Sequence, residues 1–156
     1  MVSADYIVGL TDGEGCFYVL IQPPFNKKGG ARVQLKFFIK VQAGDKLMLD
    51  KVRKAFGCGA VYFQAEKRAN HTQCYRYTVA SHQDIFGIII PFFLTHPLQA
   101  ASKKKSFIAF CRIAKLVKKG AHLTKDGITQ IQQLKADMNH RTRVVREIRT
   151  LRGNAK

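Results

Sequence analysis

The clearest pattern in the chain is an alternation of apolar and polar residues from Arg32 to Gln42. Aliphatic residues and phenylalanine fill every second position, while arginine, lysine and glutamine fill most of the positions between them. Successive side chains of a β-strand point to opposite faces of a sheet, so this alternation predicts a strand with one buried and one polar face. Phe38 interrupts the polar face.

Hydrophobic periodicity predicts the remaining elements in the same way. Alternating apolar runs predict three further strands, which are Cys16–Gln22, Ala60–Glu66 and Gln73–Ala80. Apolar residues three or four apart predict helices. The first helix is capped by Ser3 and ended by Gly13 and Gly15. The other predicted helices are Asp45–Phe56, Ser81–Phe93, Ala101–Lys119, Thr124–Met138 and Thr142–Leu151. The order αββαββα followed by helices predicts an α+β fold, with the helices on one side of an antiparallel sheet.

Composition favours a single packed domain. The chain has 156 residues, of which 46% are hydrophobic, and we expect one domain over residues 1–156 with a core at about 3–120 and C-terminal helices at about 121–152. Its four cysteines show neither C-x-x-C nor Cys/His spacing, so free thiols are expected. The N-terminus resembles neither a signal peptide nor a transit peptide, which predicts an intracellular protein.

The charge of the chain indicates a polyanionic partner. Lysine and arginine outnumber aspartate and glutamate by 27 to 10, a formal net charge of +17. Residues 101–156 hold 15 basic residues against three acids, so the excess is greatest toward the C-terminus. Nucleic acid is the expected partner, because a compact domain with this charge repels itself unless anions are near. A membrane is not expected, since the apolar run Ile85–Leu94 is too short to span a bilayer.

The most informative stretch is Ile7-Val8-Gly9-Leu10-Thr11-Asp12-Gly13-Glu14-Gly15. Two glycines four positions apart on a helix leave a bare stripe that a second helix can approach closely. Two acids follow where the helix ends. A glycine cap beside two solvated acids is the simpler interpretation. Only ten acids occur in this basic chain, however, and carboxylates amid cations are what a hard, oxygen-liganded metal beside a phosphodiester requires.

In these nine residues the sequence resembles the LAGLIDADG homing endonucleases. Gly9, Asp12 and Gly15 are identical to letters of that motif, and Glu14 stands for its second acid. The order of elements also matches the family core, which has a saddle-shaped sheet. The chain holds no second copy of the motif, and single-motif members act as homodimers. The resemblance therefore implies a homodimer whose interface contains Ile7, Gly9, Leu10, Asp12 and Gly13.

The resemblance also implies a metal-dependent cleavage centre. Glu14 and the carbonyl of Gly13 would bind Mg²⁺, Mn²⁺ would substitute for it, and Ca²⁺ would bind without supporting cleavage. Gln42 occupies the place of a water-positioning residue, although a plain solvent-facing amide is an equal alternative. A basic residue near the scissile phosphate matches Lys103 best, with Lys104 and Lys105 as alternatives.

The polar strand faces are the expected surface for reading DNA. Arginine and glutamine supply paired hydrogen bonds that distinguish guanine and adenine in the major groove. The expected DNA-binding residues are Tyr18, Gln22, Arg32, Gln34, Lys36, Lys40, Gln64, Arg76 and Thr78. A sheet from each of two subunits implies a long pseudo-palindromic target. The resemblance implies that the two subunits make a double-strand break in it.

Two other functions fit the sequence. One is a non-cleaving nucleic-acid binder of the same fold, such as an intron RNA maturase or a transcription regulator, although an acid at position 14 counts against it. The other is a basic structural protein of a ribonucleoprotein, which predicts a monomer. Family members are commonly encoded in organellar introns, so the resemblance implies a chloroplast or mitochondrion as the compartment.

Overall fold

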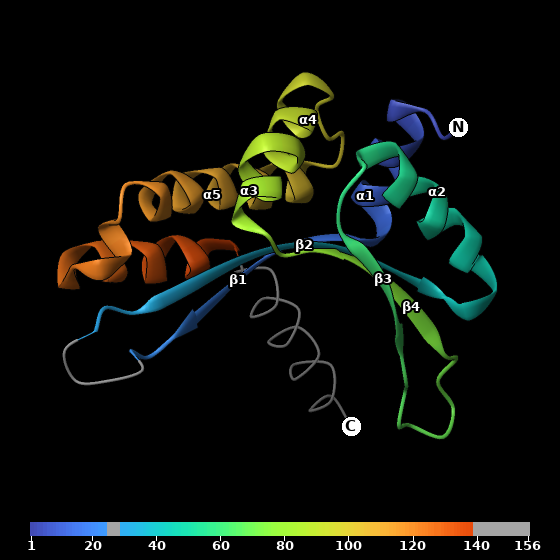
Figure 1. Ribbon diagram of the computed structural model, residues 1–156, viewed down its shortest axis with the longest axis horizontal. Helices are drawn as coiled ribbons and strands as arrows, with labels where there is room; N and C mark the ends of the chain where they lie inside the picture. Colours follow the sequence, from blue (N-terminus) through green and yellow to red (C-terminus); the bar gives the residue numbers. More distant parts are fainter. Residues whose placement is uncertain (25–28, 139–156) are drawn as a thin grey trace, which may run out of the picture.

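The computed structural model describes residues 1–24 and 29–138. A four-stranded antiparallel sheet in the order β1-β2-β4-β3 forms its centre, and the helices cover one face of that sheet (Figure 1). The sheet arches beneath the helices, so that its other face is concave (Figure 1). The predicted α+β fold is confirmed.

The strands are β1 (Gly15–Gln22), β2 (Arg32–Gln42), β3 (Ala60–Gln64) and β4 (Cys74–Val79). The helices are α1 (Ala4–Glu14), α2 (Lys46–Phe56), α3 (His82–Asp84), α4 (Ile90–Thr95) and α5 (Ala101–Lys118), with shorter turns η1 (Ala43–Asp45), η2 (Ile85–Ile89) and η3 (Ala121–Leu123). Residues 125–138 are also helical, and the helix predicted at 142–151 lies outside the described residues. Within the described parts of the chain, no helix is both long and apolar enough to cross a bilayer.

Strand β2 lies between β1 and β4, and its apolar face forms the middle of the core. The five apolar positions between Val33 and Val41 are each at most 8% exposed. Phe37 is fully buried, with ring centroids 5.3 Å from Phe17 and 5.4 Å from Phe93. The alternation in sequence therefore determines which face of the sheet receives the helices.

The segment predicted as one helix over Ser81–Phe93 is instead divided. It consists of α3, the π-helical turn η2 and α4, and it continues through Pro91 to Thr95. In η2 the N–H of Ile90 reaches the carbonyl of Ile85, five residues back. A wider turn accommodates Pro91, which has no N–H to donate and whose ring would clash in a regular helix. Helix α4 then ends just before Pro97, as expected for the residue preceding a proline.

We expect Phe37→Ala to lower the free energy of unfolding by about 3–5 kcal/mol, because it empties the centre of the aromatic core. Tyr62→Ala is the control, since Tyr62 is 60% exposed, and it should change stability by no more than about 0.5 kcal/mol. Urea denaturation at one fixed protein concentration measures both. Equal losses for the two variants would contradict the placement of Phe37 at the centre of the core.

Candidate active site

Helix α1 has one face in the core and one face bare. Val8 and Thr11 are 6% and 0% exposed and pack inward. Gly9 and Gly13 are exposed, and a Cβ atom added at either would meet no other atom within 4 Å. The two glycines therefore form an open stripe on the outside of this chain, as a close-packing helix requires.

Ile7 differs from the expectation that it lies in an interface. It is only 2% exposed and belongs to the chain's own core. Residues 7, 8 and 11 lie on one side of a helix with 3.6 residues per turn, whereas 9 and 13 lie on another. The outward surface of α1 is therefore made by Gly9 and Gly13, with the half-buried Leu10 and Asp12 beside them.

Glu14 is the last residue of α1, and Gly15 begins β1 without a loop between them. The N–H of Gly15 donates to the carbonyl of Thr11. A Cβ atom at Gly15 would lie 2.5 Å from Thr11 Cγ2 and 2.7 Å from that carbonyl oxygen. Because the backbone of Gly15 is extended, with φ −79°, glycine is needed here for close contact and not for an unusual backbone angle. The exposed Glu14 is thereby held where the glycine stripe meets the sheet.

The two acids of the motif lie in different surroundings. Asp12 is half-buried, and its Oδ2 accepts the N–H of Gln99 at 2.9 Å, which ties α1 to the segment between α4 and α5. Its Oδ1 is buried without a hydrogen-bond partner among the described residues. Glu14 is exposed and forms no hydrogen bond or ion pair with another described residue. Asp12 therefore joins two parts of the fold, while the carboxylate of Glu14 is accessible to a ligand.

One of the three adjacent lysines lies at the end of α1. The ammonium of Lys103, in α5, donates to the carbonyl of Gly15, the residue after Glu14. Lys104 and Lys105 are exposed and line a separate hollow between α5 and the helical residues 125–138. The structure therefore brings Lys103, and neither of its neighbours, to the junction of helix and sheet.

The charges at this junction affect the thiol of Cys16. Burial raises the pKa of Cys16, and the positive charges of Lys103 and Arg76 oppose that rise. Lys103 comes from the helical layer, whereas Arg76 comes from β4 in the sheet. Two cations from distant parts of the sequence thus act on the thiol of Cys16, two residues after Glu14.

Gln42 lies at the same end of the sheet but further along it. It is the exposed last residue of β2, three positions beyond Ile39, which pairs with Gly15. Three residues of strand span about 10 Å. No hydrogen bond joins Gln42 to Glu14 or Lys103 in the described structure, so its catalytic role stays a prediction.

The described residues of one chain offer few donors for a metal ion. Among residues 1–24 and 29–138, no three histidine, cysteine, aspartate or glutamate residues gather as metal ligands. Glu14 offers a carboxylate and Gly13 a backbone carbonyl, both of which are hard oxygen donors. Magnesium commonly binds through one or two carboxylates together with phosphate oxygens. The donors fit such an ion, provided that a nucleic acid or a second chain completes the site.

All nine residues expected to bind DNA lie on the concave face of the sheet. Register partners in antiparallel strands share a face, and Tyr18 pairs with Lys36, as Lys40 does with Arg76. The same register places Gln22, Arg32, Gln34, Gln64 and Thr78 on that face. None of the nine is buried.

Two features of the concave face were not found from the sequence. Glu66 pairs with Lys40 at 2.5 Å, and the ammonium beside it holds the pKa of Glu66 below its ordinary value. The guanidinium of Arg76 lies 4.3 Å from the ring centroid of Phe38. The position of Phe38 in the alternating pattern was a signal that it faces the polar side, whereas nothing in the pattern linked Glu66 to Lys40.

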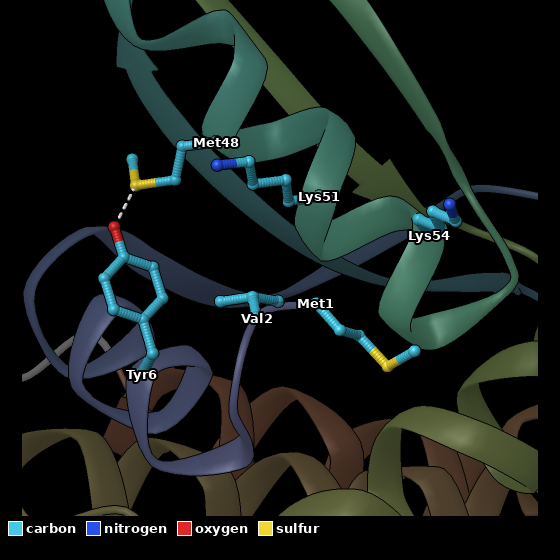
Figure 2. A pocket seen from close by; sticks show the side chains of 6 residues that line it. All are labelled: Met1, Val2, Tyr6, Met48, Lys51 and Lys54. Atoms are coloured by element: carbon cyan, nitrogen blue, oxygen red, sulfur yellow. Dashed lines mark hydrogen bonds between the residues drawn. The ribbon is translucent and has the colours of Figure 1, made fainter.

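One hollow of the described surface lies elsewhere, between α1 and α2. Its volume is ≈ 610 Å³, and its lining residues are Met1, Val2, Tyr6, Met48, Lys51 and Lys54. Figure 2 shows Tyr6 of α1 pointing toward Met48 of α2, whose sulfur accepts its hydroxyl. The lining includes no acid, so this hollow offers no carboxylate ligand for a metal ion.

Comparisons with known proteins agree with this geometry. The sequence model of the LAGLIDADG endonucleases matches residues 7–114. "Probable intron-encoded endonuclease 3" of Neurospora crassa is 33% identical over 129 residues, which are 83% of this chain and 23% of that protein. "Probable intron-encoded endonuclease 2" of the same fungus is 30% identical over 85% of this chain and 26% of its own length. This chain thus spans about a quarter of the length of these relatives.

Solved structures resemble the whole described fold. The homing endonuclease I-TnaI is 34% identical, with a TM-score of 0.76, and the match covers 94% of this chain and 98% of that one. I-SmaMI bound to cleaved DNA is 30% identical, with a TM-score of 0.77, over 88% of this chain and 44% of its own. A further structure holds I-SmaMI on an uncleaved DNA target in the presence of calcium ions.

The contact between Gly15 and Thr11 can be tested by adding one methyl group. Gly15→Ala should lower the free energy of unfolding by about 1–3 kcal/mol, because the backbone must move to admit it. Gly44→Ala is the control, since Gly44 is exposed and a Cβ there meets nothing within 4 Å. Its effect should stay within about 0.5 kcal/mol in chemical denaturation. An unchanged stability of Gly15→Ala would show that this junction tolerates a side chain.

Proposed function

Since this chain belongs to the LAGLIDADG endonuclease family, we propose that it is one subunit of a homodimeric homing endonuclease that makes a site-specific double-strand break in DNA. The observation that carries the proposal is the position of Glu14, which is exposed at the end of a helix with a bare glycine stripe and beside a polar concave sheet. Its relatives named as intron-encoded endonucleases support an intron-encoded origin, and an organelle is the compartment that we propose.

Two copies of the chain are needed because each supplies one motif helix and one Glu14. Gly9 and Gly13 leave room for the same helix of a second copy, and a twofold axis between the helices would bring the two acids near each other. Each acid would then act on one DNA strand. A single domain spanning residues 1–156 would form half of this assembly. It would bind one half of a long, pseudo-palindromic target.

At each cleavage centre, Glu14 and the carbonyl of Gly13 would hold Mg²⁺ against the scissile phosphate. Such a cation would supply stabilisation of the charge that develops on the phosphate oxygens and a lower pKa for an attacking water. Lys103 would add a positive charge near the same phosphate, and its hydrogen bond to the carbonyl of Gly15, the residue next to Glu14 in sequence, supports that role. The amide of Gln42 would orient the water through hydrogen bonds.

The concave face would lie against the major groove. Arg32, Gln34 and Arg76 offer donors that match base edges, while Lys36 and Lys40 offer point charges to phosphates. The absence of a helix on this face, among the described elements, leaves it accessible to a duplex (Figure 1). Related structures that hold DNA support a DNA duplex as the ligand, because their fold matches that of the present chain.

We expect Glu14→Gln to retain DNA affinity within a few-fold and to lose more than about 100-fold in cleavage rate, since removing even an indirect metal partner costs 10–100-fold. The substrate is a duplex selected from a randomised library in Ca²⁺ and then cleaved in Mg²⁺. Asp126→Asn, which changes an exposed acid away from the sheet, should cleave normally. Full cleavage by Glu14→Gln would refute the proposal, and stable binding without cleavage by the unmodified protein would favour the non-cleaving binder.

Gly9→Leu should disrupt the dimer. Inserting a large side chain into a close interface costs about 1–3 kcal/mol, and twofold symmetry introduces it twice, so the dimer dissociation constant should rise about 30-fold or more. Gly87→Leu is the matched control, because Gly87 is also an exposed helical glycine without neighbours within 4 Å. Sedimentation velocity distinguishes the species. A monomeric unmodified protein at micromolar concentration would exclude the proposed assembly.

A further inference from the structure

Phe38 is an apolar residue on the face that otherwise carries polar side chains. It is half-buried in the middle of β2, where it pairs with Cys16 of β1 and Thr78 of β4. Those two residues and Ala60 complete a row across the sheet with little polarity. A phenylalanine in this place contributes nothing to the core, which lies on the other face, so it requires a separate explanation.

The guanidinium of Arg76 lies over the ring of Phe38, 4.3 Å from its centroid. The register pairs Arg76 with Lys40, two residues further along β2. The side chain of Arg76 therefore runs diagonally from β4 across β2, a reach that long side chains achieve between neighbouring strands.

This contact holds Arg76 without using its hydrogen-bond donors. A guanidinium that stacks on a ring uses its flat face, while its N–H groups point outward in its own plane. Among the described residues, no acceptor bonds to Arg76, and its Nε is buried without a partner. The neighbouring Lys40, by contrast, is paired with Glu66. Of these two adjacent cations, Arg76 is the one that lies over an aromatic ring and is not paired with an acid of the described chain.

We propose that Phe38 is a positioning residue for DNA recognition, whose ring holds the Arg76 guanidinium in the orientation that reads one guanine in each half of the target. The inference rests on the proposed function. Guanine presents two acceptors, O6 and N7, to the major groove, and the planar fork of arginine matches both. A phosphate would accept any positive charge, whereas an oriented fork favours a base edge.

The test is a binding-site selection from a randomised duplex library in Ca²⁺, using the full-length protein. The unmodified protein should select guanine at one position in each half-site. Arg76→Lys keeps the charge without the fork and should reduce that preference about 5- to 150-fold. Phe38→Leu keeps apolar volume without the ring and should reduce it about 2- to 5-fold at the same position alone. Phe38→Tyr keeps the ring and should retain the preference of the unmodified protein.

A second measurement examines the contact without DNA. The Nε–Hε resonance of Arg76 in the free protein should shift in Phe38→Leu, because the ring current is lost, and should stay near its original position in Phe38→Tyr. Phe86→Leu is the matched control. It removes a ring beneath Lys118, 5.5 Å away in the helical layer, and should change neither the Arg76 resonance nor base preference.

The outcomes separate the two proposals. If the unmodified protein selects no DNA sequence, the proposed function fails and the inference fails with it. If it selects a target but Phe38→Leu keeps the same guanine preference, or weakens all positions equally, the inference alone is overturned. An Arg76 resonance that is insensitive to Phe38→Leu would also overturn it.

Discussion

The close contact between Gly15 and Thr11 joins the helical layer to the sheet. Because the glycine has no side chain, α1 passes into β1 within one residue, and the carbonyl of Thr11 accepts the N–H that follows the helix. A loop at this place would let the helix end move relative to the strands. Without one, Glu14 is held by both elements, and Lys103 reaches the same junction from α5.

Electrostatics around this junction combine an accessible acid with an excess of cations. The net charge of +17 attracts a polyanion over the whole surface, which favours encounter but not a particular register. Specific contacts need side chains with limited freedom. The concave face restricts some of its cations in different ways, since Lys40 is paired with an acid and the guanidinium of Arg76 lies over a ring.

Local patterns predicted most of the fold. The alternation in β2 and the cap at Ser3 correspond to structure formed by neighbours in sequence, and both are found where expected. The burial of Ile7 in the chain's own core was not predicted, because spacing within the motif does not show which side of the helix faces that core. The division of the helix around Pro91 was also missed, since a π turn leaves no periodic signal in five residues.

The candidate site was less predictable, because its parts come together from distant segments. Position in the chain did not distinguish Lys103 from its neighbours, and only the direction of α5 shows which lysine faces Gly15. The acid beside Lys40 lies 26 residues away, in a segment that follows β3. Long-range contacts of this kind depend on strand register, which periodicity alone does not give.

Because the side chain of Arg76 runs diagonally, the residues of the concave face cannot all be treated as independent of one another. Its backbone belongs to the row of Lys40, whereas its charged end occupies the row of Phe38. A scheme that assigns each residue to a base pair from its backbone position alone would therefore place the guanidinium of Arg76 beside Lys40 and not beside Phe38. If this sheet were redesigned for another DNA target, residues 38 and 76 would have to be substituted together.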